Sequence, residues 1–160
     1  MENSKGQIKP FKCFDFIFPG GIVSKLVKLE KMAHLSDTWL ESILFEKFDF
    51  AEPAPVLAVV GARNTGRGNF VVGLARAAFR SDAVILDSGV QTGMELYAIR
   101  EKVKLVGVFP GKAVQQPKVK SKKQEMNELA NGHTHMFSIT DPLYKKWGDE
   151  AIVKMRIAEM

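Results

Sequence analysis

This sequence has little cysteine and no long apolar run. Its 160 residues contain one cysteine, Cys13, which excludes a disulfide bond within the chain and is typical of a reducing compartment. No apolar run approaches the about 20 residues that a membrane-spanning helix needs, and the first residues lack the apolar centre of a signal peptide. We therefore expect a cytoplasmic protein that makes no membrane contact through this segment.

The composition is that of an ordinary globular protein. Hydrophobic residues make up 46% of the chain and charged residues 26%, and the length fits one domain with a real core. The formal net charge of +5 could attract phosphates, but solubility alone also explains an excess of this size. Composition by itself therefore leaves the function open.

Three short apolar runs, at residues 56–60, 83–86 and 103–109, alternate with helical patterns. β-Branched runs of this length with helical spacers are typical of βαβαβ units. Parallel strands that are buried on both faces are almost entirely apolar, as these runs are. The sequence therefore predicts an α/β fold, a three-layer domain with a mostly parallel sheet of about four or five strands.

Weaker patterns flank this centre. Residues 14–18 predict a strand, and 22–32 either a lysine-bearing edge strand or a short helix, with the strand favoured. A helix start is expected at residues 36–38, where Thr38 and Glu41 fit a capping box. Further elements are expected at residues 68–80 (helix), 91–102 (helix), 133–140 (strand) and 149–160 (helix). The side chains expected on inward faces include Phe79, Leu96, Ile99, Ile152, Val153 and Ile157.

Two glycine-rich turns follow the first two apolar runs, at residues 61–68 and 89–93. Glycines let a diphosphate approach backbone N–H groups at the start of a helix, and carboxyl ends of strands are where open α/β sheets bind ligands. Thr92 adds a hydroxyl and an N-cap to the second turn. Neither turn is a Walker A loop or a G-x-G-x-x-G motif. A single glycine turn is weak evidence because βα loops need glycine for geometric reasons, whereas two on neighbouring strands are better evidence.

The order of several motifs resembles the SLOG superfamily, and within it the eukaryotic-type LSDAT domain at the cytoplasmic amino terminus of TRPM channels. The similarity covers roughly residues 20–160, with 1–19 as a lead-in and a basic insertion loop at 111–126. Its matching pieces are Leu57–Asn64, Val84–Met94, Val106–Val108, Asn131–Phe137 and Trp147–Glu150.

This resemblance implies a Rossmann-like three-layer sandwich that senses a nucleotide derivative such as ADP-ribose, as the regulatory part of a TRPM-like cation channel on the cytosolic face of the membrane. The first turn would line the pyrophosphate with the second opposite it, residues 133–135 would stand at the mouth of the cleft, and two basic residues of the last helix would face phosphates. The implied nucleotide-binding residues are Gly61, Ala62, Arg63, Asn64, Gly89, Gln91, Thr92, Gly93, Met94, His133, Thr134, His135, Lys154 and Arg156.

The sequence departs from the family pattern in two places. Ser88 stands where many relatives have glycine, and the family's final strand with its Gly-Gly-x-Gly-Thr loop is absent. The fold is therefore expected to be truncated, with another chain or chain segment completing the sheet. Without that partner, Ile152, Val153 and Ile157 are expected to expose more apolar surface than a soluble monomer normally does.

Other chemistries find less support in the sequence. His133 and His135 lack the further ligands of a zinc site, so no metal is expected, and no cofactor is required. Asp87 is expected to cap the turn at Gly89 instead of acting in catalysis. The acid–base loop of the related phosphoribohydrolases is absent, so we expect no enzyme. The lysine-rich segment 112–123 has no interleaved aromatics, so nucleic acid is not expected. The alternative to a sensor is a structural or interaction module with a degenerate nucleotide site.

Overall fold

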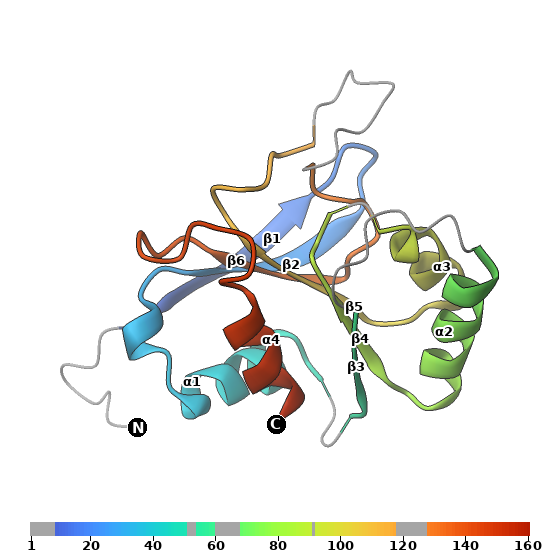
Figure 1. The fold of residues 1–160 in the computed structure, drawn as a ribbon, viewed down its shortest axis with the longest axis horizontal. Helices are drawn as coiled ribbons and strands as arrows, with labels where there is room; N and C mark the ends of the chain where they lie inside the picture. Colours follow the sequence, from blue (N-terminus) through green and yellow to red (C-terminus); the bar gives the residue numbers. More distant parts are fainter. Residues whose placement is uncertain (1–8, 51–53, 60–67, 91, 118–127) are drawn as a thin grey trace.

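The computed structural model describes residues 9–50, 54–59, 68–90, 92–117 and 128–160. Its centre is one six-stranded sheet with the strand order β1-β2-β6-β5-β4-β3 (Figure 1). β1 is antiparallel to β2, and every other neighbouring pair is parallel. The strands are β1 (Phe11–Ile17), β2 (Val23–Leu29), β3 (Val56–Ala58), β4 (Val84–Asp87), β5 (Leu105–Pro110) and β6 (His135–Ile139).

Helices cover both faces of the sheet, as Figure 1 shows. On one face lie α1 (Asp37–Glu41), the π-helical segment η2 (Ser42–Lys47) and α4 (Ala151–Ala158). On the other face lie α2 (Gly68–Arg80) and α3 (Met94–Glu101). A short 3₁₀ turn, η1 (Met32–His34), links β2 to α1. The predicted three-layer α/β architecture is confirmed, with six strands in place of four or five.

The alternation along β5 shows how its two faces pack against different apolar clusters. Val106 and Val108 pack in the cluster that includes residues of α4, whereas Leu105 packs in the cluster with residues of α2 and α3. All six residues of β5 are buried. Burial on both faces is therefore why the sequence of this strand is a continuous apolar run.

Several local expectations need correction. Residues 23–29 form the expected strand, but it is not at an edge, because β1 pairs along its outer side. The N-cap of α1 is Ser36, whose hydroxyl accepts a hydrogen bond from the Trp39 N–H, so the box at Thr38 is not formed.

Some side chains expected on inward faces are exposed. The exposed fractions are 58% for Phe79, 68% for Leu96, 47% for Ile99 and 49% for Ile152. On α3 the reason is that Glu95 is buried with Met94 and Ala98, which turns Leu96 outward. Val153 and Ile157 are buried in the core, so the apolar exposure expected of them is wrong. Within the described residues, no helix combines the length and hydropathy needed to span a membrane.

Candidate functional site

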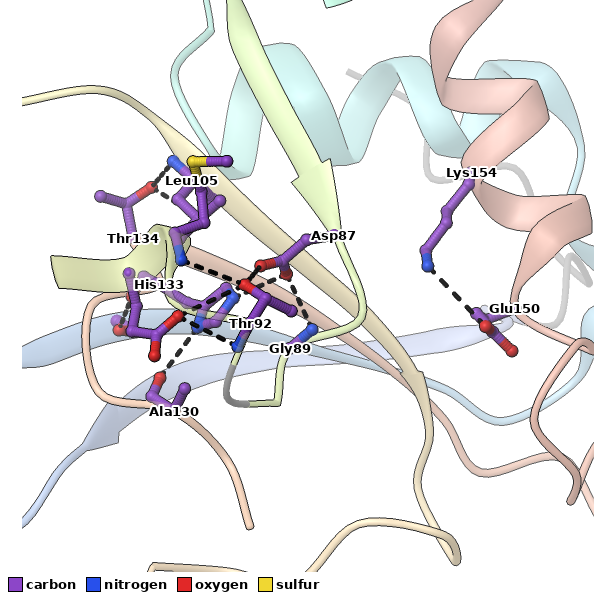
Figure 2. Close-up of polar contacts among 12 residues, drawn as sticks. Asp87, Gly89, Thr92, Leu105, Ala130, His133, Thr134, Glu150 and Lys154 are labelled. Atoms are coloured by element: carbon purple, nitrogen blue, oxygen red, sulfur yellow. Dashed lines mark hydrogen bonds and ion pairs between the residues drawn. The ribbon is translucent and has the colours of Figure 1, made fainter. Parts of the chain in front are cut away.

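The turn that follows β4 is organised by the carboxylate of Asp87, the last residue of that strand. Its Oδ1 accepts hydrogen bonds from the Gly89 N–H (2.8 Å) and faces Nε2 of His133 (2.7 Å). Its Oδ2 accepts a hydrogen bond from the Thr92 hydroxyl (3.1 Å). Figure 2 shows these groups converging on the one carboxylate. The expectation that Asp87 caps the turn at Gly89 is confirmed.

The start of α3 is closed by reciprocal hydrogen bonds similar to those of a capping box. Oε2 of Glu95 accepts a hydrogen bond from the Thr92 N–H (3.3 Å), and Oγ1 of Thr92 accepts one from the Met94 N–H (3.3 Å). This reciprocal pattern satisfies backbone donors that the helix itself cannot pair. The N-cap of α3 is Gly93, which has no side-chain cap hydrogen bond, so the expectation that Thr92 is the N-cap is wrong by one residue. Thr92 and Glu95 are both buried, so their polar groups serve the turn itself.

A second loop, residues 129–134, backs this turn and is called the backing loop below. The Ala130 N–H donates to the Gly89 carbonyl oxygen (3.0 Å), and the Ala130 carbonyl oxygen lies 2.8 Å from Nδ1 of His133. Gly132 has a φ of +133°, and a Cβ there would lie 2.8 Å from the backbone oxygen of Glu95. The Gly132-His133 pair therefore brings the backing loop against both β4 and α3.

A glycine in β5 makes room for this cluster. A Cβ on Gly107 would lie 2.6 Å from Cα of Gly89 and 3.0 Å from Cδ2 of His133. Gly107 pairs with Asp87 in the sheet, so the missing side chain falls directly beneath the turn. No larger residue fits at this position without displacing the cluster.

One basic side chain, Lys154 of α4, is buried beside this edge of the sheet. It is 7% exposed, and its Nζ lies 3.7 Å from Oε1 of Glu150, a distance longer than a hydrogen bond. Figure 2 shows Lys154 and Glu150 on the side of Asp87 opposite to His133. Burial lowers the pKa of Lys154, and the charges of Glu150 and Asp87 offset only part of that effect. The ammonium is therefore a desolvated cation at the carboxyl end of β4.

Comparison with known families now identifies the domain. Residues 54–160 match the family described as SLOG in TRPM, prokaryote. The chain belongs to this family. The match agrees with the Rossmann-like sheet and with the SLOG/LSDAT resemblance, although the matching version is the prokaryotic one instead of the eukaryotic type. No curated protein matches the chain.

This SLOG domain brings together some of the expected site residues. Gly89, Thr92, Gly93 and Met94 form the second glycine turn and the start of α3, and Gly89 and Gly93 have φ values of +73° and +84°. Thr92 and Met94 are buried, so neither side chain faces solvent. Gly61, Ala62, Arg63, Asn64 and Gln91 lie outside the described residues.

The expected position of residues 133–135 at the mouth of a cleft is wrong. β6 begins at His135, so these residues lie at the amino end of a parallel strand and not at its carboxyl end. His133 is fully buried beneath the turn, and together with Thr134 it lines a cavity of about 320 Å³ that also contacts Ile99 and Val103. The Thr134 hydroxyl donates to the Leu105 carbonyl oxygen (3.0 Å).

His135 belongs to an aromatic cluster on the other face of the sheet. Its ring centroid lies 4.5 Å from that of Phe48 and 4.6 Å from that of Phe50. Burial lowers the pKa of His135 to about 4, an effect reinforced by the positive charges of Lys104 and Lys25 and only partly opposed by a hydrogen bond with the Phe48 backbone. This histidine is therefore neutral at physiological pH.

Arg156 does not join the turn. Its Nε and Nη2 lie 3.2 and 2.6 Å from Oδ1 of Asp37, and its Nη1 donates to the Leu35 carbonyl oxygen (2.8 Å). The side chain thus ties α4 to the start of α1. Of the two basic residues expected to face phosphates, the structure leaves only Lys154 beside the β4–α3 turn.

Glu95 and Gly107 are the site residues that the sequence reasoning missed. Thr92-x-x-Glu95 has the spacing of a capping box, so the hydrogen bond from the Thr92 N–H to the Glu95 carboxylate could have been predicted from the sequence. Gly107 has no comparable signal, because its partners Gly89 and His133 are remote in sequence. Among the described residues, no group of three or more His, Cys, Asp or Glu side chains is arranged to hold a metal ion.

Proposed function

We propose that this SLOG domain is a cytoplasmic ligand-sensing module that binds a nucleotide derivative of the ADP-ribose type at the carboxyl edge of its sheet. The observation that carries the proposal is the buried ammonium of Lys154 beside the turn at Gly89 and Gly93. Within the part of the chain that the structure describes, the ion pair of this desolvated cation is 3.7 Å long, so the cation gains from a phosphate oxygen at hydrogen-bond distance. The start of α3 adds the positive end of a helix dipole.

The side chains that line the turn act as its scaffold in this proposal. The Thr92 hydroxyl and the Gly89 N–H already bind Asp87, so a ligand would contact the outer backbone of the turn and not these groups. The first glycine turn, including Gly61 and Arg63, is proposed as the opposite wall from its sequence. In a TRPM-like channel the domain would regulate opening from the cytosolic side, with another chain completing the site.

A second candidate function is an interaction module with a degenerate nucleotide site. It is favoured because the polar groups of the turn already have partners within the protein: Thr92 and Glu95 pair with each other and with the Met94 N–H without a ligand. On this view Lys154 and Glu150 form only a structural ion pair. We propose no catalytic activity for either candidate.

Calorimetric titration of the 160-residue chain with ADP-ribose, AMP and ribose 5-phosphate separates these candidates. We expect saturable binding of ADP-ribose that weakens about 10- to 100-fold in Lys154→Gln, because a charge-assisted hydrogen bond contributes about 1.5–3 kcal/mol. Lys145→Gln, an exposed lysine of the segment before α4, is the matched control and should bind as the wild type does.

Two outcomes would count against the sensor. Absence of binding by any of the three ligands in a chain that melts cooperatively favours the interaction module. Release of base and ribose 5-phosphate from AMP would instead establish a hydrolase and overturn both candidates.

A further inference from the structure

The protons of His133 can be assigned from its partners. Nδ1 lies 2.8 Å from the Ala130 carbonyl oxygen, and a carbonyl oxygen can only accept a hydrogen bond. Nδ1 must therefore carry a hydrogen. Nε2 lies 2.7 Å from Oδ1 of Asp87, so the protonation of the second nitrogen depends on whether that carboxyl group is itself ionised.

The contacts of Asp87 fit an ionised carboxylate that accepts several hydrogen bonds. Its Oδ1 also accepts from the Gly89 N–H, which can only donate, and its Oδ2 lies 3.1 Å from the Thr92 hydroxyl. An ionised carboxylate has about four lone-pair sites, so it can accept hydrogen bonds from Gly89, Thr92 and Nε2 of His133 at the same time. Opposite an ionised carboxylate, Nε2 of His133 must donate as well, which makes the ring an imidazolium.

The surroundings of the ring fit a buried charge that is balanced locally. His133 and Asp87 are both 0% exposed. Among the described residues, the charged groups that act on His133 are Asp87 from β4 and Glu95 from α3, and Lys154 from α4 lies on the far side of Asp87. Burial lowers the pKa of His133, but the charge and hydrogen bond of Asp87, together with Ala130 and Glu95, outweigh it and raise the pKa above its ordinary value.

We propose that His133 is a positioning residue of the ligand site, a buried imidazolium whose ion pair with Asp87 holds the β4–α3 turn against the backing loop, so that binding at this edge is lost when the ring deprotonates. The inference rests on the proposed nucleotide site for its ligand, but the ion pair itself is independent of that function. With Asp87 ionised, a neutral ring would place a lone pair of Nε2 or of Nδ1 opposite an acceptor oxygen, and either arrangement is repulsive at 2.7–2.8 Å.

The sign of the pH dependence follows from this geometry. The folded state binds the proton of His133 more tightly than the unfolded chain does. The stability that the His133–Asp87 ion pair contributes is therefore fully present below the ordinary pKa of 6.5. It is lost as pH rises through the higher pKa of the folded state. Above that pKa, the affinity for a ligand that needs the turn held by this ion pair should fall about 10-fold for each pH unit.

Two measurements on the whole chain test the proposal. The first is ¹⁵N NMR of the histidine side chains without ligand, with the exposed His34 as an internal reference. We expect both ring nitrogens of His133 to be protonated at pH 7, and the amide signals of Gly89 and Thr92 to move together with its deprotonation at higher pH. A neutral ring at pH 7, or turn amides that do not respond to deprotonation, would overturn the positioning role.

The second measurement is the affinity for ADP-ribose as a function of pH. The wild type should lose affinity above the pKa that NMR gives for His133. His133→Gln should bind at least about 10-fold more weakly at pH 7 and should lack the fall in affinity at that pKa, because its amide can donate to Asp87 but carries no charge. His34→Gln, the control, should keep the wild-type profile. A wild-type affinity that stays constant through the titration of His133 contradicts the proposal.

The two proposals fail in different ways. If ADP-ribose does not bind, the ligand assignment falls, while the NMR titration still decides whether His133 positions the turn. If His133→Gln does not fold, the wild-type pH series and the amide signals supply the test.

Discussion

Replacing Gly107 with alanine tests the packing on which the site depends. The new Cβ would lie 2.6 Å from Cα of Gly89 and 3.0 Å from Cδ2 of His133, where ordinary contacts need about 3.4 Å or more. The closer contact is to backbone, which cannot rotate away as a side chain can. Relief therefore requires a shift of the turn relative to β5.

The expected loss of stability can be estimated from two effects. Overpacking of a well-packed interior by one methyl group typically costs about 1–3 kcal/mol. A shift that separates His133 from Asp87 adds to this, because it leaves buried charges less well compensated. We expect Gly107→Ala to lower the free energy of unfolding by about 2–4 kcal/mol.

Gly73→Ala is the matched control, since Gly73 lies within α2 and a Cβ there would have no heavy atom within 4 Å. It should stabilise the protein by about 0.5–1 kcal/mol through helix propensity. Urea denaturation of both variants and the wild type gives the two free energies. Equal stabilities for Gly107→Ala and the wild type would refute the close packing of Gly107, Gly89 and His133.

Two further variants test other parts of the structure. His135→Phe keeps an aromatic ring beside Phe48 and Phe50 but removes a group with a pKa of about 4. Between pH 6.5 and pH 4 the unfolded chain gains a proton on His135 that the folded state does not, so the loss of stability over this range should shrink by up to about 3 kcal/mol in the variant. An equal loss of stability in wild type and variant, measured by denaturation at each pH, would contradict this. Asp37→Asn removes the partly exposed ion pair with Arg156 and should cost about 0.5–1 kcal/mol at low salt, less at high salt, without changing ADP-ribose affinity; a weakened affinity would show that this pair belongs to the ligand site.

The sequence was sufficient to predict the centre of the fold. The runs at β4 and β5 are apolar because both faces are buried, and this pattern distinguishes parallel strands without knowledge of their partners. The place of β2 inside the sheet could not be predicted, because it depends on whether β1 pairs outside it. Lys25, one of the lysines interpreted as protecting an edge, instead forms an ion pair with Asp15 of β1.

The candidate site was predictable only where its signals are local. Asp87, Gly89 and Thr92 lie within six residues, and their roles as cap and turn residues follow from spacing. The role of His133 depends on a contact with Asp87 that spans 46 positions. Arg156 shows the same limit, because its partner Asp37 is 119 positions away and turns a basic residue of α4 toward α1. Such pairings are set by how the strands and helices pack in the folded chain, which no local pattern records.

The most direct test of the account is a ¹H–¹⁵N NMR titration of the chain with ADP-ribose. If the carboxyl edge of β4 is the ligand site, the backbone signals of Gly89, Thr92 and Gly93 and the side-chain signals of Lys154 will shift and saturate together. Saturable shifts confined to other parts of the chain, or none with ADP-ribose, would contradict the assignment of this edge as a nucleotide site.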